Sequence, residues 1–491
     1  MRTKRPRAKD AFDRVPVEIW REIASLLSRS QHKALMHVPH VLGKLSSELF
    51  YRDIVLYYGT LPLSLIEFGD LSTGHPVNHQ LERWHAKRCR GIISRISQDS
   101  QFAQRVRTLK VYASGRQDPM SRQMTSLSKA LPNLKRLEHF ACHGTHYALS
   151  SLIAALLPTT VPQLKGLEIK YVGLNPPEFP VIPANLESIA IEPVASTYLL
   201  FLGSASSLRD LRIGSHHHIT PLTPLNMRKL IHLELYRTTP YSTAGSFPFE
   251  IVLRDGAHLE SLRVEHFQPS QTPSVHFRRY SHSLPHLKRF GIFFSSPGSP
   301  AEYDFDLFPA ICDFLRNKSG LVTLELIAPS NPIGQQSLGF GKGCWDLLPT
   351  LVNLRCLSMT LTKLGDSEHC TQFIPRSVTS LTLLGKFGEK VISASCQAHW
   401  PNFLRFLHLD EYPSDRAARK IATYVPSVYI VRLQTSHFNV VSRTPGRPVK
   451  VEQWTQRTEE YFWREQLEAQ GCEDRLLYML PSAHKFDSCY I

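Results

Sequence analysis

Three short segments carry the side chains best suited to metal, phosphate or acid–base chemistry: "CHGTH" (142–146), "SHHHIT" (215–220) and "GFGKG" (339–343). The first holds one Cys and two His, but a structural zinc site needs four ligands, and no second cluster lies near it in the sequence. The second follows a predicted strand, and we interpret it as a solvated turn. The third lacks the Lys-Ser/Thr ending and the preceding strand of a phosphate-binding loop. The sequence therefore predicts no metal site and no cofactor.

The sequence also lacks the common signatures of catalytic nucleophiles and metalloproteases, such as G-x-S-x-G, H-E-x-x-H and the Cys–His patterns of cysteine proteases. Its nine cysteines are scattered along the chain without a C-x-x-C pair, which is typical of reduced thiols in an intracellular protein. We therefore predict a protein that is not an enzyme and has no catalytic residues.

The chain of 491 residues carries a formal charge of +15, and part of this excess lies in its first ten residues, "MRTKRPRAKD". Two interpretations of this basic arm stay open, a nuclear-localisation signal and a solvated disordered segment. No apolar run follows it, as a secretory signal would require, and no stretch approaches the roughly 18 apolar residues of a membrane span. The sequence therefore predicts an intracellular protein, cytoplasmic or nuclear, without a membrane segment.

The elements that must position any interaction surface come from an internal repeat, apolar-x-x-apolar-x-apolar, with core residues at positions 1, 4 and 6. Successive copies are spaced by 22 to 34 residues, and the only misfit at position 6 is His139 in the second copy. The residues at position 1 of the thirteen copies are Val106, Leu134, Leu164, Leu186, Leu208, Leu230, Leu259, Leu287, Leu321, Leu354, Val378, Leu404 and Val428.

Positions 4 to 6 alternate as in a strand, so positions 4 and 6 point to the same side. The connecting segments "SRQMTSLSKALP" and "LFPAICDFLRNKSG" have apolar residues at helical spacing. One short strand with one helix cannot bury its apolar edge, whereas stacked copies can. We therefore predict an α/β solenoid with a parallel sheet on its inner side.

Over residues 106–435 the copies resemble the irregular leucine-rich repeats of the ribonuclease-inhibitor type, which implies a horseshoe. That family often has Asn or Cys three positions after the last apolar residue, and among the first copies only Cys142 matches. We interpret the longer spacings as insertions, for example "SSPGSPAEYDFD" and "APSNPIGQQSLGFGKG".

Position 5 of each copy is expected to face the concave surface, where charges of both signs occur instead of the positive track that a nucleic-acid groove needs. Aromatic residues follow position 6 in several copies, and aromatic residues beside Arg are typical of protein interfaces. We therefore expect a protein substrate on this face, with the alternative that the aromatic residues pack beneath insertions or neighbouring loops. The candidate substrate-binding residues are Tyr112, Phe140, Arg212, Tyr236, Arg263 and Phe293.

Residues 12–57 have another pattern, that of three short helices. Pro16 stands near the first helical position, where its missing N–H costs nothing. Ile19, Ile23 and Leu27 belong to one apolar stripe. A second helix is expected through Leu35, and a third precedes the closing segment "FYRDIVLYY".

This segment resembles the F-box found in front of leucine-rich repeats in many fungal proteins, whose pattern is L-P-x-E-I/L-x-x-x-I-x-x-x-L, then an apolar second helix, a V-x-x-x-L stretch and a closing R-x-I-x-L. F-boxes bind the Skp-type adaptor of cullin–RING ubiquitin ligases, and the attached repeats capture the substrate. The resemblance therefore implies a substrate-recognition subunit of an SCF-type (Skp–cullin–F-box) E3 ubiquitin ligase. It assigns the adaptor contact to Val15, Pro16, Glu18, Ile19, Ile23, Leu27, Leu35 and Val38.

The segment departs from the family pattern at Val15, Gln31, His32 and Leu42, positions that bear on affinity for the adaptor more than on the fold. The alternative is a helical cap that seals the first repeat of a leucine-rich-repeat scaffold without a ubiquitin-ligase role. The predicted organisation is a disordered basic arm (1–11), an F-box-like module (12–57), a helical linker or N-terminal cap (58–105), the repeats (106–435), and a linker with a C-terminal capping helix (436–491).

Overall fold

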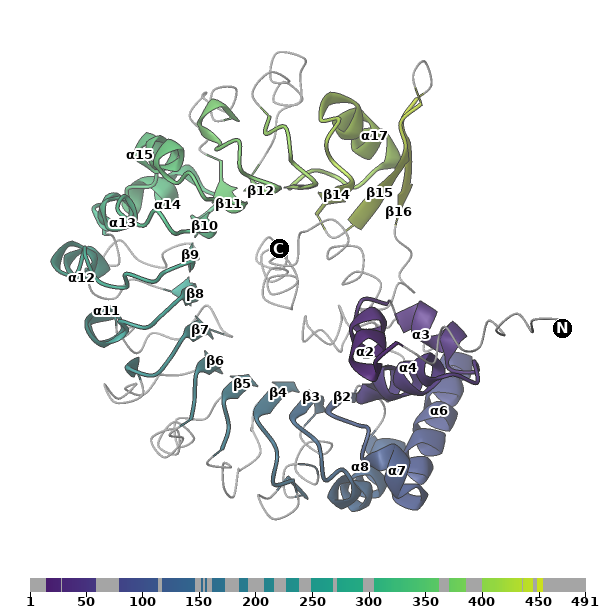
Figure 1. Ribbon diagram of the computed structural model, residues 1–491. Coiled ribbons are helices and arrows are strands. Elements are labelled where there is room, and N and C mark those ends of the chain that lie inside the picture. The colour runs from purple at the N-terminus through teal and green to yellow at the C-terminus, as the bar shows by residue number, and fades with distance from the viewer. Residues whose placement is uncertain are drawn as a thin grey trace, which may run out of the picture. The chain divides into compact units, whose positions relative to one another are not determined.

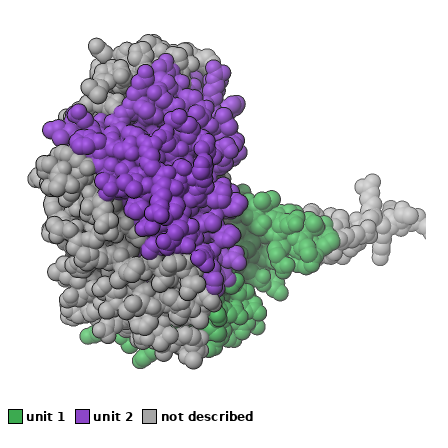
Figure 2. All heavy atoms as spheres, turned by 90° about the vertical axis from the view of Figure 1, so that its left-hand side faces the viewer, with its two compact units in different colours: residues 1–66, 71–186 green, residues 67–70, 187–491 purple. Residues whose placement is uncertain are grey.

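The computed structural model (Figure 1) divides into two compact units, unit 1 with residues 1–66 and 71–186, and unit 2 with residues 67–70 and 187–491 (Figure 2). In each unit, short parallel strands follow one another in chain order, which makes the fold an α/β solenoid. The structure describes residues 15–27, 29–58, 79–113, 117–145, 152, 155–156, 161–172, 185–192, 207–215, 227–237, 249–267, 272–294, 304–361, 371–385, 400–434, 436–444 and 448–453.

The described part of unit 1 starts with the helices α2 (Val17–Ser25), α3 (Arg29–Leu35) and α4 (Val41–Arg52), which lead directly into a parallel sheet. The other helices described in this unit are α6 (His79–Gln98), α7 (Ser100–Ala103), α8 (Gln117–Ala130) and the 3-10 helix η1 (Leu131–Asn133). The strands, each parallel to the next, are β1 (Asp53–Tyr58), β2 (Thr108–Ala113), β3 (His139–Thr145) and β4 (Gly166–Val172).

Unit 2 shows the same alternation of strands and helices. Its parallel strands are β5 (Ser188–Glu192), β6 (Asp210–Ser215), β7 (His232–Arg237), β8 (Ser261–Phe267), β9 (Arg289–Phe294), β10 (Thr323–Ile327), β11 (Cys356–Thr360), β12 (Ser380–Leu384), β13 (Phe406–Leu409) and β14 (Ile430–Leu433). In Figure 1 the helices from α11 to α15 lie on one side of these strands. The helices described are α11 (Phe249–Asp255), α12 (Pro273–Arg279), α13 (Leu307–Leu315), α14 (Pro332–Ser337), α15 (Lys342–Leu347), α17 (Asp415–Tyr424) and the 3-10 helices η4 (Leu348–Thr350) and η5 (Thr371–Phe373).

The repeat template explains both the core and the pairing of the strands. Positions 1, 4 and 6 are buried copy after copy, as in Leu262 and Val264 of β8. The N–H groups that follow position 1 donate to the preceding copy, for example from Glu260 to the carbonyl of Ile231 at 2.8 Å. Every stacked copy therefore buries its apolar edge and satisfies its backbone at the same time.

The second copy is shifted by three residues from the predicted alignment. In the sheet Phe140 pairs with Leu109 and Cys142 with Val111, so the core residues of this copy are Leu137, Phe140 and Cys142. The apolar residues at 134, 137 and 140 fit the template in two registers. The predicted alignment took Leu134 as position 1, whereas the sheet places Leu137 there. The misfit at His139 and the assignment of Cys142 to the Asn/Cys position are both corrected by this shift, because Cys142 is itself position 6.

The sheet starts earlier in the chain than residue 106. β1 is the closing segment of the F-box-like module, and it pairs with β2 over its whole length, from Asp53 with Thr108 to Tyr58 with Ala113. Helix α6 then packs on β1 through Cys89, whose Sγ lies 3.3 Å from the carbonyl of Tyr57. The module ends inside the sheet, and the segment 58–105 supplies the helix of a first strand–helix unit.

The C-terminal end of unit 2 differs from the predicted linker. β15 (Ser436–Ser442) and β16 (Lys450–Gln453) add to β14 as antiparallel strands. Arg443 donates to backbone carbonyls at the end of α17 and just after it, including that of Val425 at 3.5 Å. The expected capping helix lies outside the described residues except for its start, which is strand β16.

The predicted insertion before β11 is structured as the two short helices α14 and α15. Its "GFGKG" segment turns between them, with Gly339 at a φ of +67°, where a Cβ would lie 2.1 Å from the carbonyl oxygen of Phe305. Glycine is required there by both conformation and space. Much of the other predicted insertion, and the histidines at 146 and 216–218, lie outside the described residues.

Candidate interaction surfaces

Helix α2 presents the apolar stripe that the sequence predicts. Pro16 is its N-cap, and its carbonyl accepts from the N–H of Ile19 at 3.1 Å. Ala24 is fully buried on one side of the helix, whereas Ile19 and Ile23 are 44 % and 40 % exposed and Leu26 is 84 % exposed on the other. The stripe thus faces solvent instead of the first repeat.

The other predicted adaptor-contact residues lie around this stripe. Pro16, Glu18 and Val38 are exposed, and Val15, Leu27 and Leu35 are half-buried. Among the departures from the family pattern, Gln31 is exposed, Val15 and Leu42 are half-buried, and His32 is buried inside the module. His32 therefore affects the packing of the module more than its surface.

The module is held together around the start of α4. The rings of Trp20 and His40 meet edge to face with 5.0 Å between centroids, and Nδ1 of His40 accepts from the N–H of Leu42 as the N-cap of α4. At Gly43 a Cβ would lie 2.1 Å from the carbonyl oxygen of Val38, so the turn before α4 can close only over a glycine.

The C-terminal half of α4 is fixed to the repeats of unit 1. Arg105 donates from Nη1 to the hydroxyl of Ser47 at 3.0 Å, and the rings of Tyr51 and Phe102 meet with 5.0 Å between centroids. The N–H of Arg107 donates to the carbonyl of Arg52 at 2.8 Å. Helix α4 therefore caps the sheet, while α2 carries the exposed stripe.

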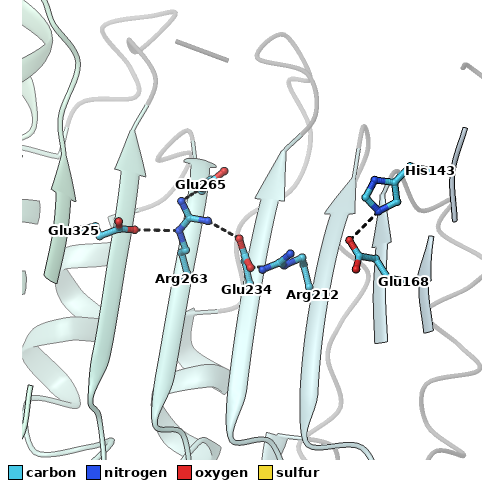
Figure 3. A network of polar contacts seen from close by, with 7 residues as sticks. All are labelled: His143, Glu168, Arg212, Glu234, Arg263, Glu265 and Glu325. Atoms are coloured by element: carbon cyan, nitrogen blue, oxygen red, sulfur yellow. Dashed lines mark hydrogen bonds and ion pairs between the residues drawn. The ribbon is translucent and has the colours of Figure 1, made fainter. Parts of the chain in front are cut away.

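We call the side of the sheet that carries positions 5 and 7 the strand face; it lies opposite the core side. In unit 1 this face carries a row of rings from neighbouring strands. Tyr57 stacks on Tyr112 with 5.2 Å between centroids, and Tyr112 meets the ring of His143 at 4.9 Å. Nε2 of His143 lies 3.0 Å from Oε1 of Glu168 (Figure 3). Tyr112 and His143 are buried, so this row stabilises the strand pairing from the face that the sequence assigned to a substrate.

In unit 2 the strand face carries a network of alternating charges (Figure 3). Arg212 of β6 pairs with Glu234 of β7, and Glu234 accepts from Nη1 of Arg263 on β8 at 2.6 Å. Arg263 also pairs with Glu265 on its own strand and with Glu325 of β10, at 3.1 Å between Nε and Oε2. We call these five residues the charge network.

The charge network holds the carboxylate of Glu234 ionised. Burial alone would raise the pKa of Glu234, but the positive charges of Arg212 and Arg263 and their hydrogen bonds outweigh it, so the pKa lies below its usual value. The guanidinium of Arg263 also lies over the ring of Phe293, 4.7 Å from its centroid. Arg263 and Phe293 are therefore occupied by contacts within unit 2.

These positions correct the predicted exposure of the candidate substrate-binding residues. Phe140 is a core residue, and Tyr112, Arg263 and Phe293 are buried in contacts between strands, while Arg212 is half-buried in an ion pair. The side chain of Tyr236 lies outside the described residues. Tyr112 packs against Tyr57 and His143 of neighbouring strands, Phe293 packs against Arg263, and Phe140 lies in the core. Arg212, Glu234 and Arg263 stand at position 5 of three consecutive copies, and such an alternation of opposite charges is a sequence signal for ion pairs between strands.

Cys142 and His143, adjacent in the sequence, point to opposite faces of β3. Cys142 lies in the core, where burial raises the pKa of its thiol, and His143 lies on the strand face. A Cys–His pair for nucleophilic chemistry is therefore not formed here. Over the described residues, no group of three or more His, Cys, Asp or Glu is placed to hold a metal ion, and none of the described helices is long and apolar enough to cross a membrane.

Comparisons with known proteins give similarity to solved structures only, since no family model and no curated protein matches the chain. The crystal structure of the yeast Rad7–Elc1 complex aligns with 79 % of this chain and 95 % of that chain, at 11 % identity and a TM-score of 0.38. The leucine-rich-repeat-containing protein LegL7 from Legionella pneumophila aligns with 77 % of this chain and 90 % of that chain, at 13 % identity and a TM-score of 0.28. A protein from Bacteroides fragilis aligns with 70 % and 69 %, at 12 % identity and a TM-score of 0.26. The template residues and strand register of the chain itself make its fold an α/β solenoid of irregular leucine-rich repeats.

Proposed function

We propose that this chain is the substrate-recognition subunit of an SCF-type E3 ubiquitin ligase. In this proposal the module α2–α4 binds a Skp-type adaptor, which links the chain to a cullin–RING ligase, and the repeats bind a protein substrate. The chain would supply proximity between substrate and ligase without chemistry of its own. An intracellular location, cytoplasmic or nuclear, belongs to the same proposal.

The observation that carries the proposal is the exposed stripe of α2. Ile19, Ile23 and Leu26 stand at i, i+4 and i+7, the spacing by which an amphipathic helix anchors in an apolar groove of its partner. Each of these side chains is at least 40 % exposed, and transfer of such surface out of water favours association by about 25 cal/mol per Å². Ile19 and Ile23 are among the residues that the F-box resemblance assigns to the adaptor, and Leu26 extends the stripe beyond them.

The second candidate, a scaffold whose helical front only caps the repeats, is supported by a different part of the module. Helix α4 runs into β1, and its residues Ser47 and Tyr51 contact the first repeats of unit 1. A cap of this kind accounts for α4 and β1. It does not account for an apolar stripe that faces away from the sheet.

Adaptor binding can be tested by size-exclusion chromatography of the full chain with a purified Skp-type adaptor. We expect co-elution, and we expect the double substitution I19D/I23D to abolish it. The matched control V275D/I333D places the same charges on exposed apolar positions of α12 and α14 in unit 2 and should leave the complex intact. Co-elution of the I19D/I23D chain, or no complex with the unaltered chain, would refute the proposal.

The two candidates also differ in stability. If the stripe seals the repeats, I19D/I23D should destabilise unit 1, whereas exposed residues should change the free energy of unfolding by about 0.5 kcal/mol or less each. Deletion of residues 1–57 does not separate the two, because it removes most of β1 and leaves β2 at the edge of the sheet. Point substitutions on α2 leave this pairing in place.

A further inference from the structure

One face of helix α6 is rich in positive charge. Between residues 83 and 98 the sequence has no Asp or Glu. Its exposed side chains include five cations, which we call the basic face: Arg83, Lys87, Arg88, Arg90 and Arg95. Arg95, at the end of this face, also pairs with Asp99 at 3.6 Å and lies over the ring of Phe102, 4.4 Å from its centroid. The basic cluster is visible in the sequence as "RWHAKRCR" (83–90), but it was not among the predicted interaction sites.

The opposite side of α6 fixes this face in place. Cys89, Ile93 and Ile96 are buried, and their spacing of four and three residues places them on one side of the helix. Helix α6 contacts β1, α7 and α8. The helix is therefore anchored along one side over most of its described length. The cations on the other side are held at helical spacing on a rigid element.

Trp84 gives the basic face an apolar anchor. It is 52 % exposed, and the guanidinium of Arg88 lies 5.4 Å from the centroid of its ring. The ring also meets that of His85 edge to face at 5.1 Å, which limits its rotation. Trp and Arg are the residues most enriched among those that dominate binding energy at protein interfaces, so an exposed Trp among arginines is an interface composition.

We infer that α6 binds an acidic segment of a partner protein, whose Asp and Glu carboxylates pair with the basic face while an apolar side chain packs on Trp84. Arg83, Lys87 and Arg90 succeed one another at one-turn intervals of about 5 Å. From Arg83 to Arg95 the face spans about 18 Å, the length of five or six extended residues. The surface differs in chemistry from the apolar stripe of α2, and the inference does not depend on the proposed function.

The arrangement favours carboxylates in a row over a single phosphate or a nucleic acid. A phosphate dianion is bound by guanidinium groups that converge, whereas these cations are distributed over several turns. A single strand of nucleic acid stacks successive bases on several aromatic platforms, and Trp84 is the only aromatic residue exposed on the described part of α6.

The test measures fluorescence anisotropy of a labelled Glu-rich peptide with one central Leu, titrated with the full chain. We expect saturable binding that weakens as salt is added, and no binding of the peptide in which Gln replaces every Glu. Charge reversal by R83E/K87E/R90E should weaken binding at least about tenfold. The matched control R416E/R419E/K420E reverses two Arg and one Lys on exposed positions of α17 in unit 2, with the same change in net charge, and should retain the affinity.

The anchor has its own test. Trp84→Ala should weaken binding about tenfold, and replacement of the central Leu of the peptide by Gly should then cost nothing further, because the two side chains form one contact. The inference is overturned if the peptide does not saturate, or if reversal on α17 weakens binding as much as reversal on α6. It is also overturned if a labelled oligothymidine binds more tightly than the Glu-rich peptide.

Discussion

Arg263 and Glu325 form an ion pair that passes over Gly291. Arg263 lies on β8, Gly291 on β9 and Glu325 on β10. Strand β9 lies between the other two, and Gly291 is the register partner of both Arg263 and Glu325. The two side chains are only 5 % and 3 % exposed. A Cβ on Gly291 would lie 3.1 Å from Cγ of Arg263 and 3.2 Å from Oε2 of Glu325, so the glycine leaves the space through which they meet.

The substitution Gly291→Val should break this ion pair, since a branched side chain would occupy the path of Arg263. Arg263 would keep Glu234 and Glu265, but the buried carboxylate of Glu325 would lose this ion pair. A buried charge that loses its ion pair costs about 3–5 kcal/mol, and we expect a loss of that order in the free energy of unfolding of unit 2, measured with urea. Gly320→Val is the control, because a Cβ there meets no atom within 4 Å. Equal effects at the two positions would contradict the role given to Gly291.

Glu234 should make unit 2 sensitive to acid. Burial alone would raise its pKa, but Arg212 and Arg263 outweigh burial, so the folded pKa lies below the unfolded value of about 4.3. Its stabilisation is therefore complete above that value and is lost as the pH falls through the folded pKa. We expect Glu234→Gln to be less stable at pH 7 by about 1–3 kcal/mol, and to lose less stability than the unaltered chain on acidification. Parallel pH profiles from urea unfolding would rule this out.

The shifted register of the second copy can be tested at Phe140. As a core residue it should cost about 3–5 kcal/mol on substitution by Ala. Phe403→Ala, at a position that is 68 % exposed, should change the free energy of unfolding by about 0.5 kcal/mol or less. If Phe140 stood on the surface, as the unshifted alignment implies, the two substitutions would have similar effects in urea unfolding.

Two glycines of unit 1 should respond to Ala in opposite directions. Gly43→Ala places a Cβ against the carbonyl of Val38 and should destabilise the module by about 1–3 kcal/mol. Gly91 lies inside α6, and an added Cβ there meets no atom within 4 Å. Gly91→Ala should therefore stabilise unit 1 by about 0.5–1 kcal/mol through helix propensity. Thermal unfolding followed by circular dichroism measures both, and a shift of the same sign would contradict the packing described at Gly43.

The sequence by itself determined the repeat and therefore the kind of fold. Apolar residues at positions 1, 4 and 6 recur because each strand must bury one side against its neighbours, and this constraint is local enough to be visible in a single copy. The stripe of α2 was predicted for the same reason, since Ile19 and Ile23 follow helical spacing. The exposure of that stripe was not visible, because an amphipathic pattern does not say whether its partner belongs to the same chain.

Only the tertiary structure decided which registers and which faces are used. Leu134, Leu137 and Phe140 allow two alignments, and pairing with β2 selected the one that places Phe140 in the core. Arg263 and Glu325 stand 62 residues apart, and their contact depends on the absence of a side chain at Gly291 on a third strand. Such contacts are set by neighbours across the sheet, which a repeat pattern aligns in sequence but does not place in space.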